Sequence, residues 1–199
     1  MTKIKLCGLT RTCDIEYANG LLSEYIGFVF AEKSRRYISP ENAEILKHKL
    51  DRKITPVGVF VDEKIEVIAD LVKRNIIDIV QLHGNENQEY IAKLRKAVDC
   101  PIIKAFHIES EADIKSANES SADYILLDSG GGTGTAFDHS LIQNLTRPYF
   151  LAGGLTPENV GTAIKTLHPF AVDASSSLET DGFKDKMKMT AFVKAVRKE

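Results

Sequence analysis

Eight short runs of β-branched and other apolar residues recur along this chain, and a longer segment with helical spacing follows each run. This alternation constrains the fold most strongly, because it is typical of βα units that build a parallel sheet. The expected strands cover residues 3–7, 25–30, 55–61, 78–83, 101–106, 123–128, 148–153 and 169–174. The expected helices cover residues 12–22, 40–50, 64–74, 88–98, 111–118, 138–144, 157–168 and 186–198.

Eight βα units in 199 residues predict an α/β protein, a single-domain closed (β/α)8 barrel (TIM barrel) over residues 1–199. An open doubly wound sheet is the alternative fold. Two helix starts carry a clear signal, because Ser39 and Thr156 each stand as a candidate N-cap before a proline at the first helical position. In either fold, ligands bind beyond the carboxyl ends of the strands, so the strand ends hold the candidate site residues.

Charge and cysteine content exclude several classes of protein. The formal net charge is −2, with 26 basic and 28 acidic side chains intermingled, so we expect no nucleic-acid partner. The most apolar stretches, residues 25–31 and 54–61, are too short to cross a bilayer, and the first five residues lack an apolar signal region. We therefore expect a cytoplasmic protein without a membrane partner. Three cysteines without paired spacing argue against disulfides and against a cysteine-rich zinc site.

Chemically active side chains stand at or just after the strand ends, where a barrel would bring them together in one site. The set comprises Cys7, Arg35, Arg36, Asp62, Gln81, His83, His107, Asp128, Gly153, Gly154 and Ser175 to Ser177. It contains acids, bases, cations and two loops of small residues. No short ligand spacing joins Cys7, His83 and Asp128, so we expect no metal.

The two loops of small residues follow the seventh and eighth strands and are candidates for a split phosphate site. Gly153 and Gly154 allow main-chain N–H groups to approach an anion, and Ser175, Ser176 and Ser177 add hydroxyl donors. Glycines after a strand are often only turns. Their occurrence as a pair in these two loops favours phosphate binding, which recurs at this place in (β/α)8 barrels.

The glycine-rich stretch at residues 129–138 does not fit a dinucleotide site. Phe137 stands where the third glycine of that motif would be, and the stretch opens the sixth unit instead of the first. We therefore expect no nicotinamide cofactor. The stretch is interpreted as a loop over the site, with Asp138 capping the next helix.

Cys7 and Asp128 each allow a structural and a catalytic interpretation. Cys7 could be a small buried hydrophobe or a base, and Asp128 a solvated loop carboxylate or a general acid with a raised pKa. Lys5 has the same strand parity as Cys7, so we expect it below Cys7 inside the barrel, favouring the thiolate. An arginine fork suits a carboxylate, so Arg35 or Arg36 could bind an acidic substrate. Gln81 and His83 could contact substrate or only neighbouring backbone.

Together these motifs resemble phosphoribosylanthranilate isomerase of tryptophan biosynthesis, in order along residues 3–185. They are KLCGLT (5–10), SRRYIS (34–39), VGVFV (57–61), VQLHG (80–84), LLDS with GGTGTAFD (126–138), LAGGLTPENV (151–160) and VDASSSLET followed by GFKD (172–185).

The resemblance implies a cofactor-free Amadori rearrangement of N-(5-phosphoribosyl)anthranilate, a small phosphorylated substrate. It implies Cys7 as general base and Asp128 as general acid. It also implies a substrate-binding set: Arg36 for the anthranilate carboxylate, Gly153, Gly154, Ser175 and Ser176 for the phosphate, and Gln81 and His83 in lesser roles.

Two positions depart from the family pattern, because Ser177 replaces a glycine and His139 replaces a tryptophan. A different sugar-phosphate isomerase would keep the phosphate loops without needing Cys7, Arg36 and Asp128 together. A barrel that only binds a phosphorylated metabolite would have lost Cys7 or Asp128. The sequence leaves a monomer and a homodimer equally open.

Overall fold

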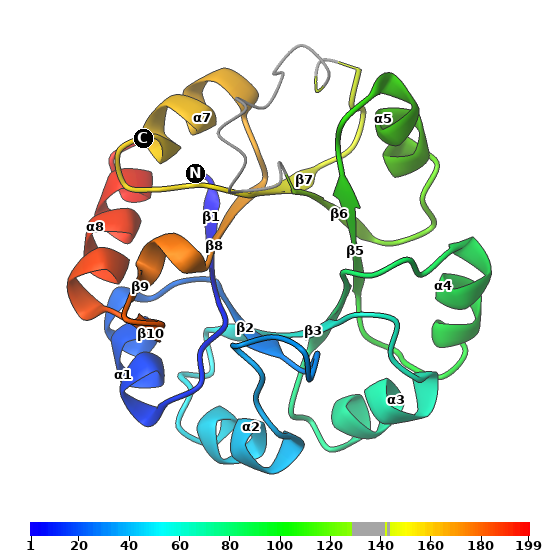
Figure 1. Cartoon of the computed structure of the whole chain (residues 1–199), viewed down its shortest axis with the longest axis horizontal. Coiled ribbons are helices and arrows are strands. Elements are labelled where there is room, and N and C mark those ends of the chain that lie inside the picture. The colour runs from blue at the N-terminus through cyan, green and yellow to red at the C-terminus, as the bar shows by residue number, and fades with distance from the viewer. Residues whose placement is uncertain (129–141, 143) are drawn as a thin grey trace.

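Eight parallel strands close into a barrel in the computed structural model, which describes residues 1–128, 142 and 144–199. Each strand pairs with the next along the chain, and β8 pairs with β1 (Figure 1). The strands are β1 (Lys3–Cys7), β2 (Tyr25–Val29), β3 (Thr55–Phe60), β4 (Ile79–Leu82), β5 (Ile102–His107), β6 (Tyr124–Asp128), β7 (Tyr149–Ala152) and β8 (Ala171–Ala174). The prediction of a closed (β/α)8 barrel is confirmed, and the open sheet is excluded.

Helices surround the barrel between consecutive strands (Figure 1). They are α1 (Thr12–Leu21), α2 (Pro40–Lys47), α3 (Ile65–Lys73), α4 (Gln88–Leu94), α5 (Glu111–Asn118), α7 (Val160–Leu167) and α8 (Lys186–Arg197). Most of the helix of residues 138–144, the glycine-rich loop before it and the capping role of Asp138 lie outside the described residues.

The cap predicted for α2 is confirmed, whereas the one predicted for α7 is wrong. The Ser39 hydroxyl accepts a hydrogen bond of 3.3 Å from the Asn42 N–H, and Pro40 is the first residue of α2. In contrast, α7 begins at Val160 with Asn159 as its N-cap residue. Thr156 instead anchors a preceding turn, since its hydroxyl accepts from the Glu158 N–H at 3.3 Å. The regular helix therefore starts later than the Thr-Pro pair suggests.

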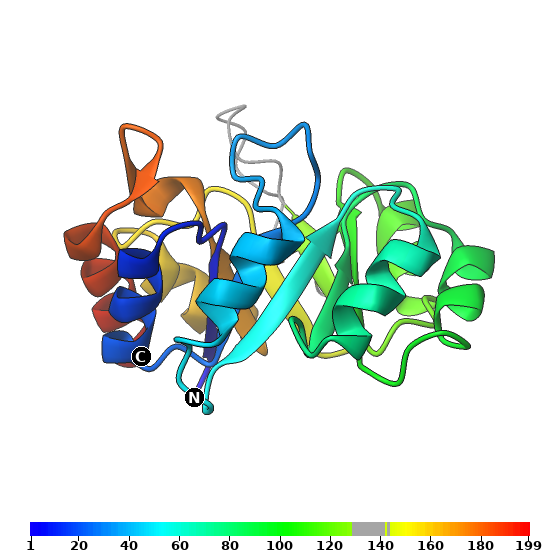
Figure 2. The same cartoon turned by 90° about the horizontal axis from the view of Figure 1, so that it is seen from below.

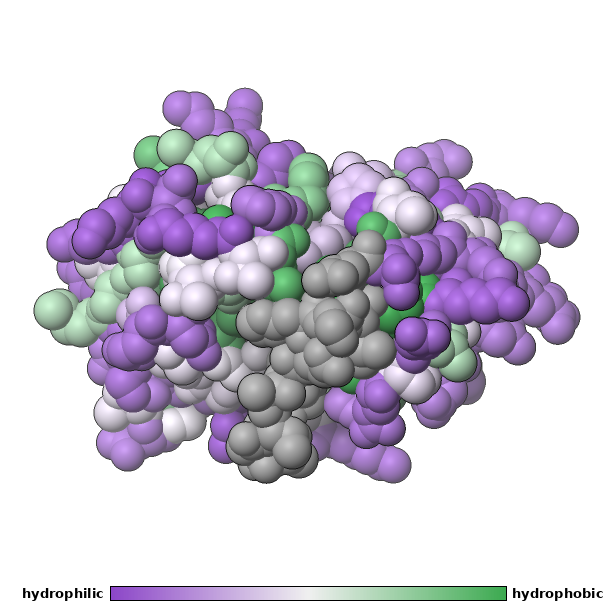
Figure 3. All heavy atoms as spheres, turned by 90° about the horizontal axis from the view of Figure 1, so that it is seen from above, coloured by the Kyte–Doolittle hydropathy of each residue, from purple (hydrophilic) through white to green (hydrophobic). Residues whose placement is uncertain are grey.

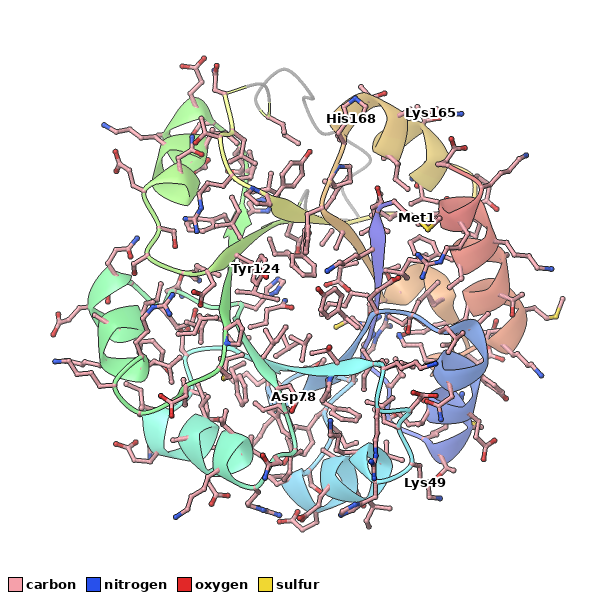
Figure 4. All side chains as sticks on the ribbon, turned by 180° about the vertical axis from the view of Figure 1, so that it is seen from behind. Met1, Lys49, Asp78, Tyr124, Lys165 and His168 are labelled. Carbon is pink, nitrogen blue, oxygen red and sulfur yellow. The ribbon has the colours of Figure 1, made fainter. Side chains whose placement is uncertain are left out.

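Two apolar layers hold the barrel together. The larger layer packs the outward-facing strand residues against the helices, and Ile4, Leu6 and Phe28 are completely buried in it. The smaller layer fills the barrel interior around Phe150, whose ring centroid lies 5.4 Å from that of Tyr25 and 5.9 Å from that of Tyr124. Tyr25 and Tyr124 are the first residues of β2 and β6, so this cluster lies at the end of the barrel where the strands begin; Tyr124 is labelled in Figure 4.

A hairpin after β8 is an element that the sequence did not predict. A 3-10 turn, η1 (Ser176–Leu178), leads into two short antiparallel strands, β9 (Glu179–Thr180) and β10 (Phe183–Lys184). The hairpin and the loop between β2 and α2 both rise from the end of the barrel where the strands finish (Figure 2). This end is therefore built up by loops, while the other end is closed by side chains.

Candidate active site

One cavity of about 330 Å³ opens at the carboxyl ends of the strands. Its lining includes every residue predicted for catalysis or substrate binding: Cys7, Arg36, Gln81, His83, Asp128, Gly153, Gly154, Ser175 and Ser176. Ser177, the departure from the family pattern, also lines it. The barrel gathers these residues from positions far apart in the chain, because all strand ends meet at one rim.

Three of the strand-end candidates lie elsewhere. Arg35 is largely exposed, with 67% of its side chain accessible. Asp62 accepts a hydrogen bond of 2.7 Å from the Asn85 N–H and holds the loop after β4. His107 lines a neighbouring cavity, which shares His83 and Asp128 with the first.

Cys7 lies on the floor of the cavity, above a buried ion pair. Lys5 is completely buried, and its Nζ lies 2.6 Å from Asp173 Oδ2. Burial raises the pKa of the Cys7 thiol above its ordinary value, and this effect outweighs the opposing influence of the Lys5 and Lys184 ammonium groups. Lys5 therefore has the predicted position, and its charge acts on Cys7 in the predicted direction, toward the thiolate. Desolvation is the larger effect, however, so the pKa of Cys7 is raised overall.

Lys5 itself stays charged. Burial opposes its ammonium form, but the Asp173 carboxylate and Cys7 together raise the pKa of Lys5 above its ordinary value. Asp173 Oδ1 is buried without a hydrogen-bond partner among the described residues, and Asp173 also lines the cavity. Gln81 Oε1 is likewise buried without a partner among the described residues, so two acceptor oxygens beside the cavity are unsatisfied.

Asp128 ends β6 and belongs to a short chain of polar contacts. His83 Nε2 lies 3.2 Å from Asp128 Oδ2, and Gln81 Nε2 lies 2.9 Å from His83 Nδ1. With the Gln81 amide donating to Nδ1, a neutral imidazole carries its proton on Nε2 and donates to the Asp128 carboxylate. Gln81 and His83 thereby orient Asp128 as well as line the cavity.

Arg36 approaches the cavity from the loop after β2 and is held by Glu179. Its Nε and Nη2 donate to the two Glu179 carboxylate oxygens at 2.5 and 2.9 Å, a bidentate pair. Gly8 makes room for this arginine, because a Cβ built on Gly8 would lie 2.5 Å from the Arg36 Cδ. Gly8 also has a φ of 79°, a conformation that favours glycine.

The two predicted phosphate loops are neighbours in the lining of the cavity, because they follow the paired strands β7 and β8. Gly153 and Gly154 have φ values of 91° and 62°, which turns the chain sharply after β7. The Ser175 hydroxyl donates to the Cys7 carbonyl at 3.0 Å, so this loop is tied to the end of β1. A contact from Ser175 to an anion would therefore use its main-chain N–H.

Four site residues were missed by sequence reasoning: Gly27, Asp173, Glu179 and Lys184. Gly27 interrupts an apolar strand, which is a signal for close approach of another group. Asp173 is a charged residue within a short apolar strand. Glu179 and Lys184 carried no signal, because the hairpin that brings them to the site was not predicted.

Two further features of the described residues bear on the class of protein. They contain no group of three or more His, Cys, Asp or Glu side chains that could hold a metal ion. None of the described helices has the length and apolar character needed to span a membrane. The side of the barrel seen in Figure 3 presents mainly hydrophilic side chains, with apolar ones in small scattered patches.

The closed barrel, with a cavity at the carboxyl ends of its strands, has the architecture of the (β/α)8 class, whose active sites lie at that rim. The model of the N-(5'-phosphoribosyl)anthranilate (PRA) isomerase family matches residues 4–195. The chain belongs to this family, the phosphoribosylanthranilate isomerases of tryptophan biosynthesis, and the resemblance seen in its motifs is confirmed.

Relatives and solved structures agree with this assignment over the full chain. The chain is 44% identical to the N-(5'-phosphoribosyl)anthranilate isomerase of Clostridium acetobutylicum, over 100% of this chain and 99% of that one. It is similar to the crystal structure of phosphoribosyl anthranilate isomerase from Thermotoga maritima, with a TM-score of 0.89, 38% identity and complete coverage of both chains. A second isomerase structure, in complex with reduced 1-(o-carboxyphenylamino)-1-deoxyribulose 5-phosphate, matches with a TM-score of 0.87, 37% identity and complete coverage of both chains.

Proposed function

We propose that the cavity catalyses the Amadori rearrangement of N-(5-phosphoribosyl)anthranilate to 1-(2-carboxyphenylamino)-1-deoxyribulose 5-phosphate, with Cys7 as general base and Asp128 as general acid. One observation carries the proposal: the thiol and the carboxyl line the same cavity as Arg36 and the glycine and serine loops. A substrate with a carboxylate at one end and a phosphate at the other matches this distribution of groups. The ligand of the related structure, a reduced form of this product, carries the same two anionic groups.

The first step opens the ribose ring. Protonated Asp128 gives its proton to the ring oxygen as the bond from C1 to that oxygen breaks, and the anilino nitrogen lone pair forms a C1=N double bond. Asp128 is left as a carboxylate. The His83 Nε2–H, 3.2 Å from Oδ2, then stabilises that charge by a hydrogen bond.

The second step moves a proton from C2. The Cys7 thiolate removes it, the electron pair forms a C1=C2 double bond, and the nitrogen regains its lone pair, which gives an enolamine. A proton then leaves the C2 hydroxyl and another joins C1, which yields the ketone. C2 is oxidised and C1 reduced within one molecule, so the electrons balance without a separate redox partner.

The remaining groups bind and orient the substrate. Arg36 binds the anthranilate carboxylate through the part of its guanidinium that Glu179 does not occupy. Main-chain N–H groups of Gly153, Gly154, Ser175 and Ser176 bind the phosphate. Holding both ends fixes C1 and C2 between Asp128 and Cys7, and such fixation lowers the entropic part of the barrier.

The test is the decay of phosphoribosylanthranilate fluorescence, with the substrate generated in situ from anthranilate. We expect turnover by the parent protein and a loss of about 10²–10⁴ in kcat for Cys7→Ala and for Asp128→Asn, the range typical of a removed acid or base. Circular dichroism of each variant serves as the folding control. A folded parent without turnover would contradict the proposal, and a variant with parental kcat would remove that residue from its role.

A further inference from the structure

Glu179 forms close hydrogen bonds with two cations at the mouth of the cavity, and a third, the exposed Arg35, lies farther off at 3.5 Å. Its carboxylate accepts the bidentate hydrogen bonds of Arg36 and also lies 2.6 Å from Lys184 Nζ through Oε1. Lys184 and Glu179 are register partners across the β9–β10 hairpin, and both are largely buried. A side chain that serves only to neutralise Arg36 would need no second cation.

The charges around Arg36 determine how much net positive charge is left to attract a substrate carboxylate. Among the closely hydrogen-bonded groups, Arg36 and Lys184 contribute two positive charges and Glu179 one negative charge, so these three keep one net positive charge. Arg35 also lies 3.5 Å from Glu179, but its side chain is 67% exposed and solvent screens its charge. Burial opposes ionisation of Glu179, but its contacts with Arg36 and Lys184 prevail and lower the pKa of Glu179 below its ordinary value. The carboxylate is therefore ionised at neutral pH, and its attraction is divided between the two cations.

Lys184 also reaches the predicted phosphate loop. Its Nζ donates to the Ser175 carbonyl at 2.9 Å and lies 3.3 Å from the Ser175 hydroxyl, which in turn donates to the Cys7 carbonyl. The same ammonium group thus contacts the arginine's carboxylate partner and the loop after β8. Nη1 of Arg36 has no hydrogen-bond partner in the part of the chain that the structure describes, and Arg36 lines the cavity.

We propose that Glu179 and Lys184 are positioning residues for substrate carboxylate recognition: Glu179 fixes the Arg36 guanidinium, and Lys184 keeps Glu179 from cancelling its charge. This inference rests on the proposed function, in which Arg36 binds the anthranilate carboxylate. It assigns the hairpin a role in substrate recognition that its sequence does not suggest.

A double-mutant cycle on Glu179 and Lys184 separates the charge on Arg36 from its orientation. Lys184→Gln leaves Glu179 to neutralise Arg36, so KM for phosphoribosylanthranilate should rise about tenfold, since charges at hydrogen-bond distance interact strongly when buried. Glu179→Gln frees Arg36 but keeps both cations, so KM should rise about threefold from lost orientation alone. The double variant Glu179→Gln/Lys184→Gln restores one net positive charge, so its KM should lie below that of Lys184→Gln.

The experiment measures KM and kcat by fluorescence decay for the parent, the two single variants and the double variant. Arg35→Met is the matched control, because Arg35 contacts the same carboxylate at 3.5 Å but is 67% exposed, and such a pair contributes little. We expect kcat within about threefold of the parent in all of them, and KM of the control within about twofold. Lys184→Arg, which keeps the charge, should also retain KM within about twofold.

Two outcomes overturn the inference. The first is a double variant whose KM equals or exceeds that of Lys184→Gln, which is the result for two independent structural losses. The second is a tenfold rise in KM for Lys184→Arg. Should Lys184→Gln fail to fold, the KM of Lys184→Arg alone tests the inference. Failure of the proposed function has a different signature, because the parent would then show no turnover, or Arg36→Met would leave KM unchanged.

Discussion

The Cys7 thiol occupies the space that a side chain on Gly27 would fill. A Cβ built on Gly27 would lie 2.6 Å from the Cys7 Sγ and 3.1 Å from the Cys7 Cα. The two residues are register partners across β1 and β2, so neither can move away without disturbing that pairing. The glycine therefore determines where the thiol can stand.

Gly27→Ala should lower kcat about 10- to 100-fold, because the methyl group displaces Sγ from the reacting carbon and small misplacements have effects of this size. KM should change little, since the anion-binding groups are untouched. Steady-state kinetics measures both constants. Gly20→Ala is the control, because nothing lies within 4 Å of its Cβ. A variant of Gly27 with parental kcat would contradict the prediction.

Gly8→Ala should raise KM, in contrast to Gly27→Ala, which should lower kcat. Its Cβ would collide with the Arg36 Cδ at 2.5 Å, so the arginine must shift. We expect KM to rise about tenfold with a smaller change in kcat, and the unfolding free energy to fall by about 1–2 kcal/mol because of the positive φ. Kinetics and chemical denaturation check the two parts, and an unchanged KM in the folded variant would refute the first.

The pH dependence of kcat/KM should report the buried thiol. Burial raises the pKa of Cys7, so the free enzyme holds the neutral thiol at neutral pH and gains the thiolate only as pH rises. The pKa that the pH profile of kcat/KM reports for Cys7 should therefore lie above the ordinary thiol value of 9.0. A profile from pH 6 to 10.5, compared with the rate of Cys7 alkylation in a Cys13→Ser/Cys100→Ser background, tests this. An apparent Cys7 pKa near 7 would show that the effect of the Lys5 ammonium group on the thiol outweighs that of burial.

Stability at high pH should depend on Tyr149. Burial raises its pKa to about 12 from the ordinary value of 10.0, and its hydroxyl donates to the Leu167 carbonyl. The unfolded chain ionises first, so this stabilisation is complete below pH 10 and is lost as pH rises through 12. The loss amounts to about 2 kcal/mol. Urea unfolding of the parent and of Tyr149→Phe between pH 8 and 12 measures this loss. The same pH dependence of the unfolding free energy in both proteins would contradict the role of Tyr149.

The fold and the candidate cavity were largely predictable from local patterns. The strand ends were recognisable because a turn or polar residue follows each apolar run, and a barrel brings all of those ends to one rim. Cys7, Asp128 and the two small-residue loops could therefore be grouped without coordinates. The boundaries of the elements were less predictable, as the late start of α7 at Val160 illustrates.

Contacts over long sequence distances could not be predicted. Glu179 pairs with Arg36 across 143 positions, and Asp173 pairs with Lys5 across 168. The parity of Lys5 indicated its direction but not its partner. The direction of the Cys7 pKa shift also required coordinates, because it depends on the depth of burial and not on the identity of the neighbouring lysine.

The Lys5–Asp173 ion pair also bears on how the barrel closes. Lys5 lies in the first strand and Asp173 in the last strand of the barrel, and they are direct register partners. A slip of one residue along this seam would place Val172 or Ala174 opposite Lys5 and turn Asp173 toward the helices. Each charge would then be buried alone, at a cost of about 3–5 kcal/mol. The final strand thus carries a carboxylate that meets its lysine in only one alignment, which makes misregistered closure during folding unfavourable.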